Sequence, residues 1–100
     1  MAMTVSAMPS ATKDKYSLAD PAPITVIILS RNRPLYLWAC LDSLYRYTRH
    51  PARFILVDNA SEDPLIHEVV TGFERREMFD TVEWHAENDP KRVLKAVRAY

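Results

Sequence analysis

The chain has 100 residues, of which 48% are hydrophobic, 26% charged and 10% aromatic. This length holds one domain, and this apolar fraction excludes wholesale disorder and fibrous repeats. Thirteen basic residues balance thirteen acidic ones, so no global charge directs the protein to nucleic acid. The single glycine, Gly72, excludes the glycine-rich nucleotide fingerprints G-x-G-x-x-G and G-x-x-x-x-G-K.

The N-terminal segment, residues 1–23, carries small and polar side chains with no sustained period, so we expect a flexible tail. It lacks the apolar block that is typical of a secretory signal. The longest aliphatic run, residues 24–29, falls far short of the ~20 apolar residues that cross a bilayer as a helix. The one cysteine, Cys40, cannot form an internal disulfide. The sequence therefore predicts a cytoplasmic protein without a transmembrane segment.

Three short stretches from residue 24 onward have the pattern of β-strands. The aliphatic runs 24–29 and 54–57 are typical of strands that are buried on both faces. In the weaker stretch 81–85, Val82 and Trp84 alternate with polar neighbours, which predicts a strand at a sheet edge or on a half-covered face.

Between and after these strands, apolar residues recur at helical spacing. The clearest stripe is Ile66, Val69, Val70 and Phe73. Two further stripes are formed by Leu37, Leu41 and Leu44, and by Val93, Leu94 and Val97. We therefore expect three amphipathic helices that bury these stripes. Because Cys40 and Ser43 fall within the first helix, we expect them to be packing positions and not nucleophiles.

The helix starts are marked by prolines at positions 34, 64 and 90, since proline is favoured in the first helical turn. Asp63 and Asp89 come directly before two of these prolines and can accept hydrogen bonds from free N–H groups of the first turn. Strand starts recur about every 30 residues, the length of a strand, crossover helix and return. The sequence predicts an α/β fold, a Rossmann-like open parallel sheet with flanking helices.

In such a sheet, ligands bind beyond the carboxyl ends of the strands. The predicted loops at that edge are the polar segments 30–33, 58–63 and 87–89. Asp58 ends an aliphatic strand, so its carboxylate can accept a hydrogen bond from a base or ribose. It can equally form a turn, because Asp-Asn-x-Ser is common turn chemistry. The residues alone leave these two interpretations even.

Arg31 and Arg33 can pair with a diphosphate, since a guanidinium matches phosphate oxygens in bidentate fashion; solvated loop charge is the alternative. Asn32 favours the latter slightly. Asp58, Glu62 and Asp63 can together coordinate a hard cation, although capping is the simpler role for Asp63.

The three histidines lie far apart in sequence, so a histidine metal site or a His-based triad has little support. The last helix carries Lys91, Arg92, Lys95 and Arg98. Such a basic face can meet phosphates or anionic lipid, and a solvated face is the simpler expectation.

Three segments resemble the opening of the family-2 glycosyltransferases. They are Val-Ile-Ile-Leu-Ser-Arg-Asn-Arg-Pro at 26–34, Cys-Leu-Asp-Ser-Leu at 40–44 and Ile-Leu-Val-Asp-Asn-Ala-Ser-Glu-Asp at 55–63. Order and spacing agree with the family pattern over residues 24–63. Asn88 resembles the asparagine that follows the third strand in this family. The resemblance implies the N-terminal half of a nucleotide-diphospho-sugar transferase fold, of the GT-A type, over residues 24–100.

By this resemblance, Asp58 would hydrogen-bond the nucleobase of the donor, typically uracil, so a UDP-sugar is the favoured donor. The loop Ser30, Arg31 and Asn32 would line the base and ribose, and Asn59 and Asn88 would border the same pocket. Two departures from the family pattern are Arg31, where many relatives carry an aromatic residue, and Asp89-Pro90, where a glycine is usual.

The resemblance also implies chemistry that this chain does not carry. In the family, an acceptor hydroxyl attacks the anomeric carbon while Mg²⁺ or Mn²⁺ stabilises the departing diphosphate. Relatives place the Asp-x-Asp metal motif on a fourth strand and the general base later still, so we assign neither catalytic nor metal-binding residues among these 100 residues. We expect the nucleotide-binding part of a sugar transferase whose acceptor is unknown, either cytoplasmic or peripheral at a membrane.

Two other classes compete with this interpretation. A signalling-type receiver module is also a parallel α/β domain, but it needs a pair of acidic residues after its first strand, where this chain has Ser30-Arg31-Asn32. A non-catalytic α/β fragment would bind a partner through its unfinished sheet. In that case self-association or a missing C-terminal half would cover the open surface.

Overall fold

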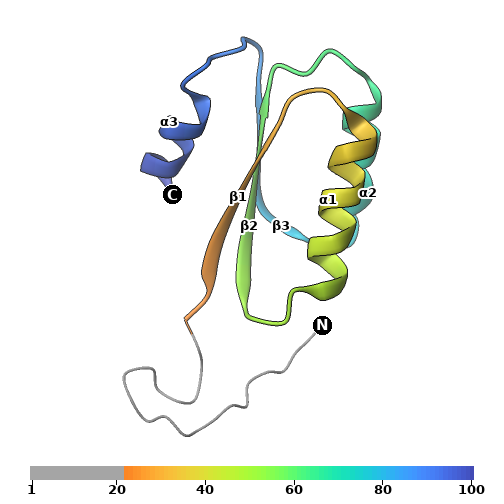
Figure 1. The fold of residues 1–100 in the computed structure, drawn as a ribbon, viewed down its shortest axis with the longest axis vertical. Coiled ribbons are helices and arrows are strands. Elements are labelled where there is room, and N and C mark those ends of the chain that lie inside the picture. The colour runs from red at the N-terminus through yellow and green to blue at the C-terminus, as the bar shows by residue number, and fades with distance from the viewer. Residues whose placement is uncertain (1–21) are drawn as a thin grey trace, which may run out of the picture.

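A computed structural model describes residues 22–100 of the chain. Strands and helices alternate strictly within this part (Figure 1). In chain order the elements are β1 (Ile24–Ser30), α1 (Pro34–Tyr47), β2 (Ala52–Asn59), α2 (Leu65–Glu74), β3 (Phe79–His85) and α3 (Arg92–Ala99). The predicted strands are all present, and β2 and β3 begin two residues earlier than expected. Of the predicted tail, residues 1–21 lie outside the described residues.

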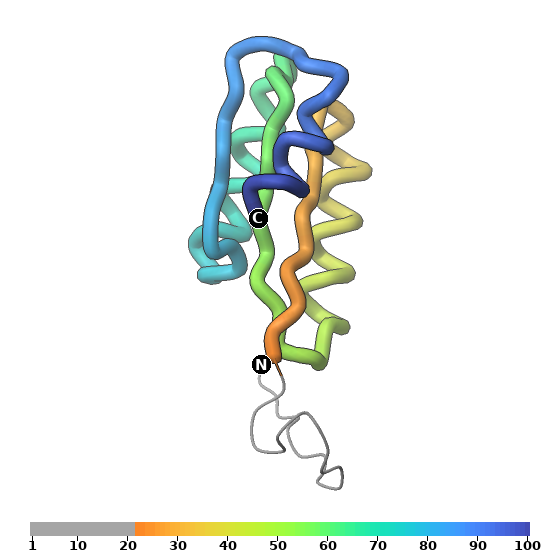
Figure 2. Tube along the Cα trace, turned by 90° about the vertical axis from the view of Figure 1, so that its left-hand side faces the viewer, coloured from red at the N-terminus to blue at the C-terminus, as the bar shows by residue number. Residues whose placement is uncertain are grey.

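The three strands form one sheet in the order β1-β2-β3, and both neighbouring pairs are parallel. The predicted parallel α/β architecture is therefore confirmed (Figure 2). The register places Ser30 beside Asp58, and Asp58 beside Trp84. Because parallel strands end at the same edge, the three loops that follow them leave the sheet together.

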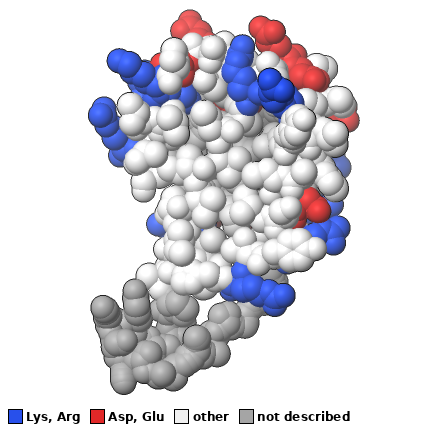
Figure 3. Space-filling model, in the orientation of Figure 1, with Lys and Arg blue, Asp and Glu red and all other residues white. Residues whose placement is uncertain are grey.

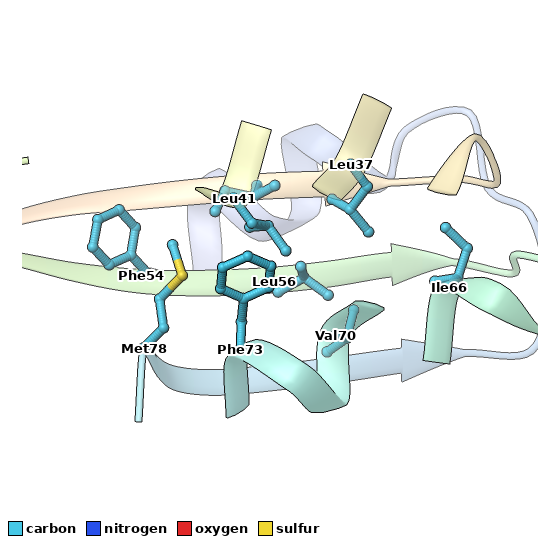
Figure 4. Close-up of a cluster of buried hydrophobic side chains, with 9 residues drawn as sticks. Leu37, Leu41, Phe54, Leu56, Ile66, Val70, Phe73 and Met78 are labelled. Carbon is cyan, nitrogen blue, oxygen red and sulfur yellow. The ribbon is translucent and has the colours of Figure 1, made fainter. Parts of the chain in front are cut away.

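Helices α1 and α2 cover one face of the sheet and α3 lies on the other (Figure 1). Between the sheet and the α1 and α2 helices lies the larger apolar core (Figure 4). Its most deeply buried side chains are Leu41, Leu56, Ile66, Val70 and Phe73. Burial of each such side chain stabilises the fold by about 1.5–3 kcal/mol, so this layer holds the fold together.

The opposite face of the sheet is covered differently from the prediction. We expected α3 to bury Val93, Leu94 and Val97, but all three are about half exposed, and Ala96 is the buried residue of this helix. Ala96 packs with Ile55 and Val57 of β2. The reason is geometric: position 96 faces the sheet, and the larger apolar side chains of α3 lie on other sides of the helix.

The helix boundaries follow the predicted signals closely. Helix α1 begins at Pro34, whereas α2 begins one residue after Pro64 and α3 begins two residues after Pro90. Asp63 Oδ1 accepts the N–H of Leu65 at 3.0 Å, and Asp89 Oδ1 accepts the N–H of Lys91 at 2.9 Å. Asp63 thus accepts a hydrogen bond from the first turn of α2 as predicted, whereas Asp89 accepts one from the residue directly before α3.

The prediction that Cys40 and Ser43 are packing positions is wrong, because both are exposed. In α1 the buried stripe consists of Leu37 and Leu41, with Leu44 packed against the same core. Position 40 directly precedes Leu41 and position 43 directly precedes Leu44, and the rotation of about 100° per residue turns both away from the buried stripe.

Candidate functional site

Polar residues gather where the strands end, at the upper end of the molecule in Figure 1. Lys and Arg lie among Asp and Glu side chains at this end (Figure 3). The N-termini of α1 and α2 point to the same edge (Figure 1), and the free N–H groups of helix N-termini favour anions. The predicted residues Ser30, Arg31, Asn32, Asp58, Asn59 and Asn88 all belong to this edge.

Asp58 is the most enclosed charged residue of the edge, with an exposed fraction of 2%. Its Oδ1 accepts the hydroxyl of Ser30 at 2.7 Å and the hydroxyl of Ser61 at 2.5 Å. Its Oδ2 accepts the backbone N–H of Ser61 at 2.8 Å. A carboxylate offers about four acceptor positions, so most of them are already used. Asp58 closes the turn that follows β2 and ties this turn to the end of β1.

Asn32 links the first loop to the second from the other side. Its backbone has a φ of 54°, a left-handed conformation that asparagine tolerates better than most residues. Its N–H donates to the hydroxyl of Ser61 at 2.7 Å. Its Oδ1 accepts the backbone N–H groups of Glu62 at 2.7 Å and Asp63 at 3.0 Å. The side chain of Asn32 therefore satisfies two N–H groups just before α2.

Arg31 is neither paired with a carboxylate nor simply solvated. Its guanidinium donates to the carbonyl oxygen of Asn59 at 3.1 Å and also to that of Ala60. The loop after β1 is thus fastened to the loop after β2 by a charge-assisted contact. Arg33 lies next to it, exposed, with a φ of 57°, and its carbonyl oxygen accepts the first hydrogen bond of α1 from Leu37.

Asn59 organises the third loop. Its Nδ2 donates to Asn88 Oδ1 at 2.7 Å and to the carbonyl oxygen of Asp89 at 3.1 Å. Its Oδ1 accepts the N–H of Asp89 at 3.0 Å and Nε of Arg92 at 3.1 Å. Arg92 also donates to the carbonyl oxygen of Glu87 at 2.8 Å. The side chain of Asn59 thereby connects the end of β2 to the start of α3.

Asp58 and Asn59 are adjacent in the chain but serve opposite faces of the sheet. Side chains alternate along a strand, so Asp58 follows the direction of Leu56 toward α1 and α2, and Asn59 follows Val57 toward α3. The candidate site therefore consists of two hydrogen-bonded networks that meet along the tip of β2, and Arg31 contacts the backbone between them.

Two residues of these networks were not among the predicted site residues. Ser61 bonds both Asp58 and Asn32, and Arg92 bonds Asn59. A serine in a turn motif and an arginine in a basic helix are both common without any ligand. The only sequence signal for Ser61 was its place in the Asp-Asn-x-Ser turn pattern.

A second titratable group lies on the α3 side of the sheet. The Tyr100 hydroxyl donates to Glu83 Oε2, and His85 Nε2 lies 2.8 Å from Glu83 Oε1. These two hydrogen bonds lower the pKa of Glu83 below its usual range, and the bond from Tyr100 has the larger effect. The same contact raises the pKa of Tyr100. Nearby, the contact with Lys95 at 2.6 Å lowers the pKa of Asp89.

The alternative role of Asp58, Glu62 and Asp63 as cation ligands finds no geometric support. Across residues 22–100, no group of three or more His, Cys, Asp or Glu side chains is placed to hold a metal ion. Asp63 caps α2 and Glu62 is exposed. His50 and His67 are exposed as well.

None of the helices in the described part of the chain combines the length and apolar character needed to span a bilayer. Comparison of the sequence and structure with family models, with curated proteins and with solved structures gave no match.

Proposed function

We propose that this chain supplies the nucleotide-binding part of a glycosyltransferase similar to family 2. The complete enzyme would move a sugar from a nucleotide-diphosphate sugar to an acceptor hydroxyl. The observation that carries the proposal is the joining of three loops at the carboxyl edge of a parallel sheet, through Asp58 on one side and Asn59 on the other. In sheets of this kind that edge is where nucleotides bind.

Within this proposal, the buried and exposed residues of the edge have different roles. Ser30, Asp58 and Asn59 are buried and hold the loops in place. Arg31 and Asn88 are exposed and border the proposed base and ribose site together with Asn32. A UDP-sugar is the favoured donor. Asp58 already accepts three hydrogen bonds and is 2% exposed, so direct contact between a nucleobase and its carboxylate would require the surrounding loops to move.

The remaining chemistry belongs to the complete enzyme in this proposal. A divalent cation, Mg²⁺ or Mn²⁺, would stabilise the departing diphosphate, and a carboxylate base would activate the acceptor. We propose that the residues for both tasks come from outside this chain. The expected activity of these 100 residues is nucleotide binding without turnover.

Thermal unfolding with and without nucleotide tests the proposal. We expect UDP or GDP, with Mg²⁺ or Mn²⁺ present, to raise the melting temperature. At about 100 times the dissociation constant, a bound ligand adds about 2.7 kcal/mol to the free energy of unfolding. A folded protein whose melting temperature none of these nucleotides changes would contradict the proposal.

The variant Asp58→Asn separates the two roles of this carboxylate. If Asp58 acts by holding the loops together, it stabilises the free protein. The variant should then lose about 1–3 kcal/mol of unfolding free energy together with nucleotide binding. If Asp58 instead hydrogen-bonds the nucleobase directly, the variant should lose nucleotide binding while its stability stays nearly unchanged. Asp80→Asn is the matched control, because Asp80 is exposed and lies near the opposite end of β3.

The alternative class, a non-catalytic α/β or signalling-type module that binds a partner, has one observation in its favour. Val93, Leu94 and Val97 are exposed on α3, which is a typical feature of a docking surface. A folded protein without any nucleotide response would favour this class.

A further inference from the structure

Helix α3 presents its larger apolar residues away from the sheet. Ala96 faces the strands, while Val93, Leu94 and Val97 have exposed fractions of 45%, 50% and 58%. In α1 and α2 the large apolar side chains Leu41, Ile66 and Phe73 are buried, although α1 also exposes large hydrophobic residues, among them Leu35, Tyr36 and Trp38. An exposed apolar stripe of this kind is unfavourable in water, and docking on another surface would remove it from water.

A stripe of basic residues runs along the same helix. Lys95 and Arg98 are three residues apart and lie on one side of α3, and the exposed Lys91 directly precedes the helix. Residues 91–100 contain no acidic side chain. Lys95 contacts Asp89 of the preceding loop, whereas Lys91 and Arg98 are exposed. Basic side chains lie on the side of the molecule where α3 is located, next to uncharged surface (Figure 3).

We propose that α3 docks on an anionic lipid surface, with Val93, Leu94 and Val97 entering the interface and the basic stripe contacting lipid phosphates. A helix with adjoining apolar and basic sides binds in this way, and an anionic leaflet attracts each cation near it. A protein partner could bury the apolar side chains, but residues 91–100 carry basic and no acidic side chains, and Lys91 and Arg98 are exposed, which favours a negatively charged surface. This proposal goes beyond the proposed nucleotide site and does not depend on it.

Co-sedimentation with lipid vesicles tests the proposal on the full chain. We expect binding to vesicles of phosphatidylcholine mixed with phosphatidylglycerol, little binding to pure phosphatidylcholine, and a decrease as salt is added. Equal binding to both vesicles, or binding to neither, would overturn the proposal.

The apolar contribution is tested by Leu94→Ser, with Leu65→Ser as its matched control. Both leucines lie on helices and have nearly equal exposed fractions, 50% and 49%. We expect Leu94→Ser to weaken binding to anionic vesicles about tenfold or more and Leu65→Ser to leave it unchanged. Equal losses in the two variants would exclude α3 as the docking element. Circular dichroism and melting temperature establish that each variant is folded.

The charge contribution is tested by the double variant Lys91→Gln and Arg98→Gln. Each removed cation should weaken binding roughly fivefold. The double variant Arg49→Gln and Arg75→Gln makes the same change of net charge at exposed positions outside α3 and should have a much smaller effect. If the protein is instead a stable oligomer without lipid, and Leu94→Ser dissociates it, a second copy covers the stripe and the lipid proposal is wrong.

Discussion

The two faces of the sheet are covered by different means. Toward α1 and α2, large side chains such as Leu41 and Phe73 are completely or almost completely buried. Toward α3, the helix contributes Ala96 to the apolar contact and is otherwise held by polar contacts, from Arg92 to Asn59 and from Tyr100 to Glu83. We therefore expect the first layer to contribute most of the stability of the domain and α3 to contribute little.

The largest expected effect concerns the first layer. Leu41→Ala should lower the free energy of unfolding by about 2–5 kcal/mol, because it leaves a cavity where the side chain has no exposed surface. Leu94→Ala removes the same atoms from α3 and should change stability by less than about 0.5 kcal/mol. Urea unfolding measures both. Similar losses in the two variants would refute the difference between the layers.

Asn59→Ala should release α3 without unfolding the rest. The substitution removes the amide that bonds Asn88, Asp89 and Arg92, at a cost of about 1–3 kcal/mol. Hydrogen exchange followed by NMR should show protection lost first in α3, while the amides of α1 and α2 keep most of theirs. Uniform loss throughout the domain would mean that α3 is an integral part of the folding unit.

Gly72→Ala should strengthen the first layer. Gly72 lies within α2, its φ is not positive, and a Cβ built there meets no atom within 4 Å. Alanine should therefore add about 1 kcal/mol, because glycine is a poor helix former. The measurement is the urea midpoint at constant slope. A decrease in stability would show that this part of α2 has less room than the structure indicates.

The smallest expected effect is a pH dependence of the free energy of unfolding that comes from Glu83, on the α3 side of the sheet. The folded state lowers the pKa of Glu83 from an ordinary value of 4.5, so this group stabilises the protein above that pH. Its contribution is lost as the pH falls through the lowered value. Because the carboxylate is about one-third exposed, we expect less than about 1 kcal/mol. Glu83→Gln should remove this part of the acid destabilisation, as measured by melting temperature between neutral pH and about pH 3; an unchanged acid profile would contradict it.

Much of the fold was predictable because local signals agree with one another. Prolines and the aspartates before them mark the helix starts, and aliphatic runs mark β1 and β2. Of these two strands only β2 is buried on both faces as expected, because β1 lies at an edge of the described sheet and is partly exposed. The orientation of α3 was not predictable in the same way. Val93, Leu94 and Val97 have the spacing of a buried stripe, so the sequence pattern predicts that they face the sheet. In the structure Ala96 faces it instead, and no pattern in the sequence indicates this.

For the candidate site, the residues at the strand ends were predicted, but their contacts with one another were not. Strand alternation sends Asp58 and Asn59 to different faces, so two neighbours in one motif belong to separate networks. Arg31 bonds two carbonyl oxygens of the next loop. Such contacts depend on loop conformation, including the positive φ angles of Asn32, Arg33 and Ala60, which no periodic pattern encodes.

The most direct test of the central claim, nucleotide binding at the carboxyl edge of the sheet, is an NMR titration of the full chain with UDP in the presence of Mg²⁺. The account predicts amide shift changes concentrated in residues 30–33, 58–63 and 87–89. No saturable shift changes, or changes confined to the opposite end of the sheet, would contradict it.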